Sequence, residues 1–448
     1  EDNGAERSES YNFSAGVSEY RWVMKDVPEL KEESFTSTLN NHISKIEFQL
    51  EAYSEPLTPK SILGTWSDLA RSLLEREDFG SSLKSNNGWL SDVVKRLVQG
   101  ASNDLDKAKK IYSYVRDNIT CSDHSGIYME QQLKNVLKTK SGSVAEVNLL
   151  LTAMLNYAGI KADPVILSTS DHGYAYALYP IIDRFNYVVS RISLEGVDYT
   201  LDASYPRLGF GKLNPDCYNG HARLINNQAT AVEYLANSIK EQKLTAITVI
   251  NNENGKWIGH MNQSPGYYES INIRDKVKEK GQDYLFKEIT KSFGQEINIS
   301  KPIIDSLTLY EAPVSLKYEF EIKTEGEDIL YMNPLFGEGY KENPFKSADR
   351  LYPVEMPYTM DETVVLTMHV PKGYVLDELP KQLKVKLNEA GEGYFEYLVT
   401  HSNGTISLRS RIKLDKATFM PDEYESLRGF FNLVVSKQSE QIVFKKIK

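Results

Sequence analysis

The sequence has few cysteines, no long apolar run and no excess of positive charge. Its 448 residues include two cysteines, Cys121 and Cys217, which excludes a disulfide-rich scaffold and a zinc site with four cysteine ligands. No apolar stretch reaches the roughly 20 residues that a membrane-spanning helix requires. We therefore expect no transmembrane segment, and no signal peptide in this chain. Acidic side chains outnumber basic ones by 62 to 52, for a net charge of −10, so nucleic acid is not the expected partner.

The rest of the composition is that of a folded protein with several domains. Apolar residues make up 41% of the chain and aromatic residues 11%, which is enough to form buried cores. A chain of this length suggests two to four domains. The run Ser54–Pro59 contains two prolines and is interpreted as a linker. We predict three regions: a β domain at 1–56, a helix-rich core at 57–215 and a mostly β domain at 216–448.

Apolar periodicity predicts the elements of these regions. Alternation with period two predicts strands in the first region at Tyr20, Trp22 and Met24, and again at Ile46, Phe48 and Leu50. Further strands are predicted at Pro164–Leu167, Phe185–Ile192, Tyr199–Asp202, Leu244–Ile250, Val314–Ile322, Val364–Val370, Leu383–Leu387, Tyr394–Val399, Ile406–Ile412 and Phe431–Val435. Helical spacing predicts helices from Trp66, at Val93–Val98, at Asp104–Ile119, from Ser143 and at Asp283–Phe293. The predicted class is α+β, with β-sandwich-like regions beside the core.

The most informative stretch is Ser141–Asn148. Ser143 and Glu146 fit a capping box, in which the hydroxyl accepts from one backbone N–H and the carboxylate returns to the other. Gly142 lets the chain turn into the helix. Taken alone, this pattern indicates a well-capped, buried helix.

The same stretch resembles the nucleophile motif of the transglutaminase-like superfamily. In that family a Gly, a small or polar residue, a Cys, any residue and an acidic residue open a buried helix that ends in Ala-Gly-Ile, as Ala158–Ile160 does here. The resemblance places Gly142 at the family Gly and Glu146 at the acidic position. It places Val144 at the nucleophilic Cys, and valine has no nucleophile.

The family's other two catalytic motifs are also recognisable. Its His normally lies in a Phe-Asn-His-like sequence, and this chain has Phe185-Asn186-Tyr187. Tyrosine, with an ordinary pKa near 10, cannot replace imidazole as a base at neutral pH. The family Asp is kept in Leu201-Asp202-Ala203. The resemblance thus implies a papain- or transglutaminase-like core with a degenerate triad at Val144, Tyr187 and Asp202.

Other assignments stay open near this motif. Ser143 is a weak nucleophile candidate because its hydroxyl is expected to cap the helix. Cys121 could be a displaced thiol, but it replaces a Trp that is usual in similar chains, which favours a packing role. Cys121 and His124 as metal ligands lack two further ligands nearby. His172 is expected in a loop. The predicted cleft residues are Gly142, Ser143, Glu146, Cys121 and His172, with no metal and no cofactor.

Short matches along the rest of the chain resemble a multidomain bacterial envelope subgroup of this superfamily. They are Trp22–Pro28, Phe79-Gly80, Ile111–Ile119, Gly126–Tyr128, Pro164–Ser168, Asn219-Gly220, Asn343–Phe345, Arg350 and Tyr352–Val354. That subgroup has an N-terminal β domain of unknown function, a transglutaminase-like core and a C-terminal β domain. The resemblance implies that 1–56 is a partial N-terminal β domain, because the family version is longer. The resemblance implies a periplasmic or outer-membrane-associated protein.

Three functional hypotheses follow. Loss of both Cys and His with the fold motifs intact favours a pseudoenzyme that binds a peptide, protein or glycan as a component of the envelope. The alternative is an active cysteine protease or transglutaminase-type acyltransferase with displaced catalytic groups. A third hypothesis makes the core only a spacer between β domains.

Overall fold

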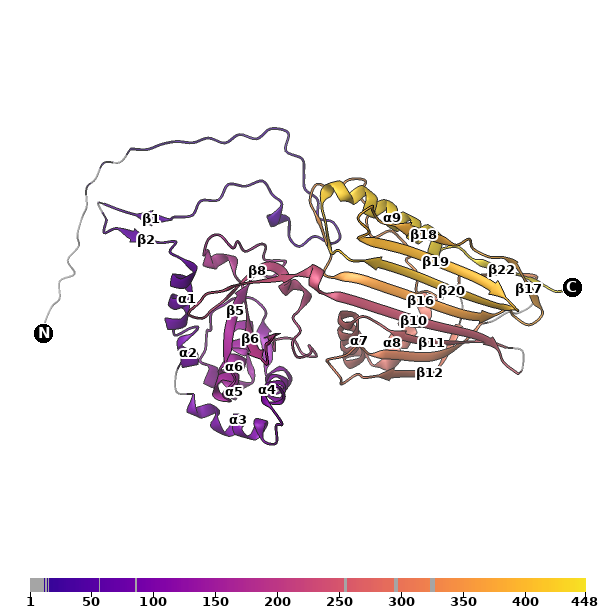
Figure 1. The fold of residues 1–448 in the computed structure, drawn as a ribbon, viewed down its shortest axis with the longest axis horizontal. Coiled ribbons are helices and arrows are strands. Elements are labelled where there is room, and N and C mark those ends of the chain that lie inside the picture. The colour runs from indigo at the N-terminus through magenta and orange to yellow at the C-terminus, as the bar shows by residue number, and fades with distance from the viewer. Residues whose placement is uncertain are drawn as a thin grey trace.

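The computed structural model describes residues 12, 14, 16–55, 57–84, 87–253, 256–293, 297–322 and 327–448. Figure 1 shows a helix-rich core, indigo to magenta, beside a larger β-rich region, orange to yellow. A long N-terminal segment runs to the β-rich region and back to the core. The fold class is therefore α+β and multidomain, as predicted. Most of the first fifteen residues of the predicted 1–56 region, and Pro56 of the predicted linker, lie outside the described residues.

The N-terminal segment does not form the strands predicted at Tyr20–Met24 and Ile46–Leu50. Its described elements are η1 (Leu39–Asn41), a 3-10 turn, and the antiparallel pair β1 (Ala52–Tyr53) and β2 (Lys60–Ser61). Trp22 is 57% exposed and Phe48 79% exposed, although their rings lie only 5.9 Å apart. The prediction is wrong because alternating residues form a stable strand only when a sheet and a second apolar layer cover them, and the described residues provide neither here.

The helical half of the core surrounds one buried helix. Its elements are α1 (Trp66–Glu75), α2 (Ser81–Lys84), η2 (Gly88–Leu90), α3 (Ser91–Val98), α4 (Asp104–Asn118), α5 (Leu133–Thr139) and α6 (Val144–Tyr157). All the helices predicted in this half are confirmed. Every residue of α6 from Val144 to Leu155 is buried, because this helix is apolar on nearly all sides and packs between the other helices and the sheet.

The sheet half of the core is antiparallel, with strand order β7-β6-β5-β8-β9. Its strands are β5 (Ala162–Leu167), β6 (Tyr187–Leu194), β7 (Val197–Leu201), β8 (Asn219–Leu224) and β9 (Ala231–Leu235). The first three match predicted strands. A separate parallel pair, β3 (Thr120–Asp123) and β4 (Ser141–Ser143), leads into α6.

The predicted boundary at residue 215 lies too early in the chain. β8 pairs with β5, and β9 pairs with β8, so residues 219–235 complete the core sheet instead of opening the next region. The sequence did not reveal this because strand pairing depends on tertiary neighbours rather than on order along the chain.

The β-rich region contains a sheet with strand order β12-β13-β11-β10-β16-β20-β19-β18. The strands are β10 (Lys240–Asn251), β11 (Trp257–Ser264), β12 (Ile297–Asp305), β13 (Ser315–Ile322), β16 (Thr359–His369), β18 (Leu383–Lys386), β19 (Gly393–Ser402) and β20 (Thr405–Leu414). β10 and β16 are parallel, and the other neighbours are antiparallel. Buried residues alternate along these strands, so one face forms the core of the region.

That buried face packs against helices and a smaller sheet. The helices are α7 (Tyr267–Lys280), α8 (Gln282–Ser292) and α9 (Tyr424–Gln438). The smaller sheet has the order β14-β22-β17, from Ile329–Met332, Ile442–Lys446 and Tyr374–Glu378. A further pair joins β15 (Val354–Glu355) to β21 (Thr418–Phe419). The remaining 3-10 turns are η3 (Ile182–Arg184), η4 (Pro215–Cys217), η5 (Ala236–Ser238) and η6 (Pro421–Glu423).

One secondary-structure prediction in this region is wrong. Phe431–Val435 was expected as a strand but lies inside α9. The buried residues Leu427, Phe431 and Val434 recur at helical spacing, whereas the short apolar run alone also fits a strand. The predicted helix at Asp283–Phe293 and the other strands are confirmed.

A loop at residues 203–217, between β7 and β8 of the core sheet, contacts the β-rich region. The Tyr267 hydroxyl accepts a hydrogen bond from the backbone N–H of Gly209 at 2.7 Å. The Tyr268 hydroxyl donates to the carbonyl oxygen of Leu213 at 2.8 Å. Both tyrosines belong to α7, so the loop is held by the start of that helix.

No helix in the described part of the chain combines the length and the apolar character needed to cross a membrane.

Candidate functional site

The structure brings together the three positions that resemble the catalytic triad. Val144 is the first residue of α6, Tyr187 is the first residue of β6, and Asp202 directly follows β7. The ends of these elements meet because α6 packs against β6, and β6 pairs with β7. The three residues are 0%, 1% and 0% exposed. We call Val144, Tyr187 and Asp202 the closed centre.

Hydrogen bonds hold the Asp202 carboxylate in this centre. One oxygen accepts from the Asn148 side-chain amide at 2.9 Å, from the Ser204 backbone N–H at 3.0 Å and from the Ser204 hydroxyl at 2.6 Å. The other oxygen accepts from the Tyr187 hydroxyl at 2.9 Å. The Asn148 side-chain oxygen, Oδ1, accepts from the backbone N–H of Ala203 at 2.9 Å. A buried carboxylate needs such partners, and both of its oxygens have them.

Tyr187 fills the base position as a neutral phenol. Its ring lies in an apolar cluster with Val144, Leu167 and Cys217. Burial, reinforced by the nearby charge of Asp202, raises the pKa of Tyr187 well above its usual value. Tyr187 therefore stays protonated at neutral pH and cannot remove a proton from a nucleophile. Val144 contributes only methyl groups to this cluster.

Gly142, Ser143 and Glu146 form the start of α6. The Glu146 carboxylate accepts from the backbone N–H groups of Ser143, Glu130 and Gln131, each at 2.9 Å. The Ser143 hydroxyl accepts from the Glu146 N–H at 3.4 Å, which completes the predicted capping box. A Cβ atom on Gly142 would lie 2.7 Å from a Glu146 carboxylate oxygen, so only glycine fits there. These groups anchor a helix, and the Ser143 hydroxyl is used in its cap.

Cys121 lies at the edge of the closed centre. The β3–β4 pairing sets it opposite Gly142. Its Sγ lies 3.2 Å from the carbonyl oxygen of Asp123 and 3.6 Å from His124 Nδ1. Burial raises the pKa of Cys121 to about 12, which strongly disfavours the thiolate. Cys121 and Cys217 are both free cysteines.

The fold places no further metal ligand beside Cys121 and His124 in the part of the chain that the structure describes. Among the described residues, no group of three or more His, Cys, Asp or Glu side chains is placed to hold a metal ion. A protein metal site generally needs at least three such ligands.

His172 is not part of the closed centre. It is exposed in the loop after β5, and its Nε2 lies 3.2 Å from the carbonyl oxygen of Asp183. The residues that sequence reasoning missed are Asn148 and Ser204. Asn148 lies one helical turn after Val144, and Ser204 lies two residues after Asp202, a spacing at which a short polar side chain commonly bonds locally. Both signals were available in the sequence.

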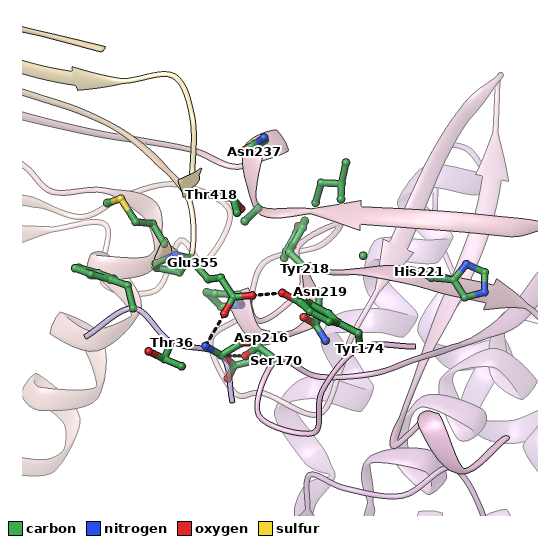
Figure 2. A pocket seen from close by; sticks show the side chains of 18 of the residues that line it. Thr36, Ser170, Tyr174, Asp216, Tyr218, Asn219, His221, Asn237, Glu355 and Thr418 are labelled. Carbon is green, nitrogen blue, oxygen red and sulfur yellow. Dashed lines mark hydrogen bonds between the residues drawn. The ribbon is translucent and has the colours of Figure 1, made fainter. Parts of the chain in front are cut away.

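A cavity of about 530 Å³ lies where the N-terminal segment, the core and the β-rich region meet. We call it the junction cavity. Figure 2 shows Thr36 from the N-terminal segment, Asp216 and Tyr174 from the core, and Glu355 and Thr418 from the β-rich region around it. None of the three residues of the closed centre lines this cavity.

Glu355 joins the three parts of the chain at the cavity wall. One carboxylate oxygen accepts from the backbone N–H of Ser37 at 2.9 Å, and the other accepts from the Tyr174 hydroxyl. Figure 2 draws both bonds. His42 Nε2 lies 3.5 Å from Glu355. The N-terminal segment, which has little regular structure, is thus fixed at this point.

Arg350 holds the adjacent backbone of the N-terminal segment. Its guanidinium donates to the carbonyl oxygens of Ser34 at 2.6 Å and Phe35 at 2.8 Å. Arg350 is 5% exposed, and the carbon atom of its guanidinium lies 4.6 Å from the centre of the Tyr352 ring. Charge-assisted bonds to two successive carbonyls orient this part of the cavity wall.

Comparisons with known proteins agree with this architecture. Residues 91–190 match the transglutaminase-like superfamily, and residues 328–444 match DUF3858, a domain of unknown function with a solved structure. A similar solved structure is that of a candidate protease from Parabacteroides distasonis ATCC 8503, at 16% identity and a TM-score of 0.48. The match covers 85% of this chain but only 58% of that one, so this chain spans less than two thirds of its length. No curated protein matches the chain. The chain thus carries a transglutaminase-like core domain followed by a DUF3858 domain.

Proposed function

We propose that this protein is a non-catalytic member of the transglutaminase-like superfamily that binds a peptide, protein or glycan. The observation that supports this proposal is the closed centre. Val144 stands where a thiol nucleophile is required, and the phenol of Tyr187 stands where an imidazole base is required. All three aligned residues are buried and, where polar, hydrogen-bonded to one another.

The chemistry of the family needs both missing groups. A cysteine attacks as its thiolate, which a helix N-terminus and a neighbouring imidazole stabilise. Asp202 could only orient a base, and it has none to orient. We also propose a place in the bacterial cell envelope, which rests on the sequence resemblance to envelope proteins. The junction cavity supplies the accessible surface for a ligand, which favours binding over a role as a mere spacer.

The test is an activity assay on the full chain. We expect no incorporation of a fluorescent amine into casein and no cleavage of casein, in parallel with an active transglutaminase and a cysteine protease as positive controls. Turnover that disappears in a Cys121→Ser variant would contradict the proposal. Turnover that survives this change and is removed by further purification would belong to a contaminating enzyme, whereas turnover that stays with the purified protein would also contradict the proposal.

One observation favours the second candidate function, an active enzyme with displaced groups. Cys121 Sγ and His124 Nδ1 lie 3.6 Å apart beside the closed centre. Against it, burial raises the pKa of Cys121 to about 12, and the thiol is placed to donate a hydrogen bond to the Asp123 carbonyl oxygen. Labelling with iodoacetamide at pH 7 separates the two functions. Labelling of Cys121 far slower than that of a model thiol supports the non-catalytic proposal, and fast labelling supports the displaced thiol.

A further inference from the structure

The junction cavity is lined by negative charge without a matching positive charge. Asp216 and Glu355 are among the described residues that line it, and none of these residues is Lys or Arg. His221 also lines the cavity, but burial, with a smaller contribution from Arg223, lowers its pKa to about 4. His221 is therefore neutral at pH 7. An anionic ligand such as a phosphate or an acidic sugar would meet two carboxylates and no cationic side chain among the described lining residues.

Of the two carboxylates, Asp216 is the one with an oxygen available to a ligand. Glu355 already uses both oxygens, for Ser37 and Tyr174. Asp216 is exposed, and one of its oxygens accepts from the Ser170 hydroxyl at 2.9 Å. No hydrogen bond from the described part of the chain engages its other oxygen. Figure 2 shows Asp216 and Ser170 together on one side of the cavity.

Aromatic rings complete the lining. Tyr174 is fixed by its bond to Glu355, and Tyr218 packs edge-on against Tyr234 at 6.2 Å. Burial raises the pKa of Tyr218, so it remains a neutral phenol. Neutral tyrosine rings attract an ammonium or guanidinium group over their faces, and the attraction grows in a partly desolvated site.

The two amide side chains among the described lining residues are partly used inside the protein. The Asn219 amide donates to the carbonyl oxygens of Thr169 at 3.1 Å and Gly173 at 2.8 Å. The Asn237 side-chain oxygen accepts from the backbone N–H of Ala417 at 2.7 Å. A neutral sugar is recognised through many donors and acceptors for its hydroxyl groups, and the Asn219 amide group is already engaged by backbone carbonyls. Recognition by charge is therefore favoured over recognition of hydroxyl groups.

We propose that the junction cavity binds a peptide segment through a lysine or arginine side chain, whose cation contacts Asp216 and the rings of Tyr174 and Tyr218. The volume, about 530 Å³, accommodates such a side chain with its flanking backbone. This inference rests on the proposed binding function and names the class of its ligand.

The test uses the full chain and calorimetric titration with acetyl-Ala-Ala-Lys-Ala-Ala-amide. Matched peptides carry norleucine or glutamate in place of lysine, and chitotriose serves as a neutral sugar. We expect the lysine peptide to bind at least about tenfold more tightly than the norleucine peptide, and its affinity to fall as salt rises. Equal binding of the norleucine peptide, binding of the glutamate peptide or binding of chitotriose alone would overturn the inference.

Two variants test whether the lysine of the peptide contacts Asp216. Asp216→Asn keeps the size and the bond to Ser170 while removing the charge, and we expect it to weaken the lysine peptide about tenfold. Asp171→Asn removes an equally exposed charge from the neighbouring loop, outside the lining, and should leave the affinity unchanged. Equal affinity for Asp216→Asn and the parent protein would overturn the assignment.

Mass spectrometry of the same mixtures separates the two proposals. Peptide turnover would contradict the non-catalytic function, whatever the affinity. Absence of both binding and turnover would overturn only the basic-peptide inference.

Discussion

The closed centre and the junction cavity place acidic side chains in opposite situations. Asp202 is 0% exposed, and both of its oxygens accept hydrogen bonds from within the core. Asp216, only 14 residues later, is exposed and uses one oxygen for Ser170. The first carboxylate stabilises the fold, and the second is available to a ligand.

This difference separates two properties that a catalytic site must combine. Catalysis needs reactive groups held in fixed geometry and also open to substrate. In this chain the fixed geometry stays with Asp202, Asn148 and Ser204, while the open surface lies at the junction cavity. Under the non-catalytic proposal, the polar network around Asp202 serves the stability of the fold.

One loop links the two regions. Residues 203–217 begin after Asp202 and end just after Asp216, and their middle is held by Tyr267 and Tyr268 of α7. From the core side, Arg116 donates to the carbonyl oxygen of Leu208 at 3.0 Å. The position of the cavity wall therefore depends on the contact between the core and the β-rich region.

The largest expected effect comes from removing the buried carboxylate. Asp202→Ala removes the buried acceptor of hydrogen bonds from Tyr187, Asn148 and Ser204, so we expect a loss of about 3–5 kcal/mol in the free energy of unfolding. Calorimetry of the full chain, with the transition of the core assigned by its shift, measures this loss.

Asp216→Ala is the matched control for that prediction. It removes the exposed carboxylate at the other end of the loop, and we expect a change within about 0.5 kcal/mol. Similar losses for both variants would contradict the contrast between a structural and an available carboxylate.

The three positions of the closed centre were chosen through the family resemblance, whereas no sequence pattern indicated the junction cavity. Gly142, Ser143 and Glu146 form a local pattern, and the motif around Tyr187 and that around Asp202 each lie within three residues. The cavity instead draws on segments near residues 36, 174, 216, 355 and 418, which share no local spacing. Its assembly depends on how the domains dock, which a single sequence does not encode in any periodic signal.

The fold shows the same division between local and tertiary signals. The capping box and the following apolar run correctly predicted the central helix α6, and the alternation of apolar and polar residues correctly predicted β13. Alternation at Trp22 and Phe48 failed because no sheet covers these residues in the described structure. The strand predicted at Phe431–Val435 was wrong because a short apolar segment fits a buried helix as well as a strand.

A smaller effect tests the contact that holds the linking loop. The Glu241 carboxylate accepts from the backbone N–H groups of Tyr267 at 3.0 Å and Tyr268 at 3.1 Å, at the start of α7. Burial raises the pKa of Glu241 from 4.5 to about 7. Folding therefore favours the protonated form. The contribution of Glu241 to the free energy of unfolding is complete below about pH 4.5 and is lost as the pH rises through about 7.

We therefore expect Glu241→Gln to reduce the fall in unfolding free energy between pH 5.5 and pH 8 by about 1–3 kcal/mol. Calorimetry at both pH values provides the measurement. Glu279→Gln, an exposed change on the same helix α7, should leave the fall as it is in the parent. An unchanged fall in the Glu241 variant would show that this carboxylate does not titrate as described.

The smallest effect tests whether the closed centre has adapted to its present residues. Val144→Cys together with Tyr187→His restores the family's reactive residues, but it removes apolar packing and the bond from Tyr187 to Asp202. We expect a loss of about 1–2 kcal/mol in unfolding free energy, measured by urea titration. Val165→Cys, at another buried position of the same cluster, measures how much unfolding free energy a valine-to-cysteine change costs in these surroundings. A double variant more stable than the parent would mean that Val144 and Tyr187 do not pack to the advantage of the fold, and that the centre still favours its catalytic residues.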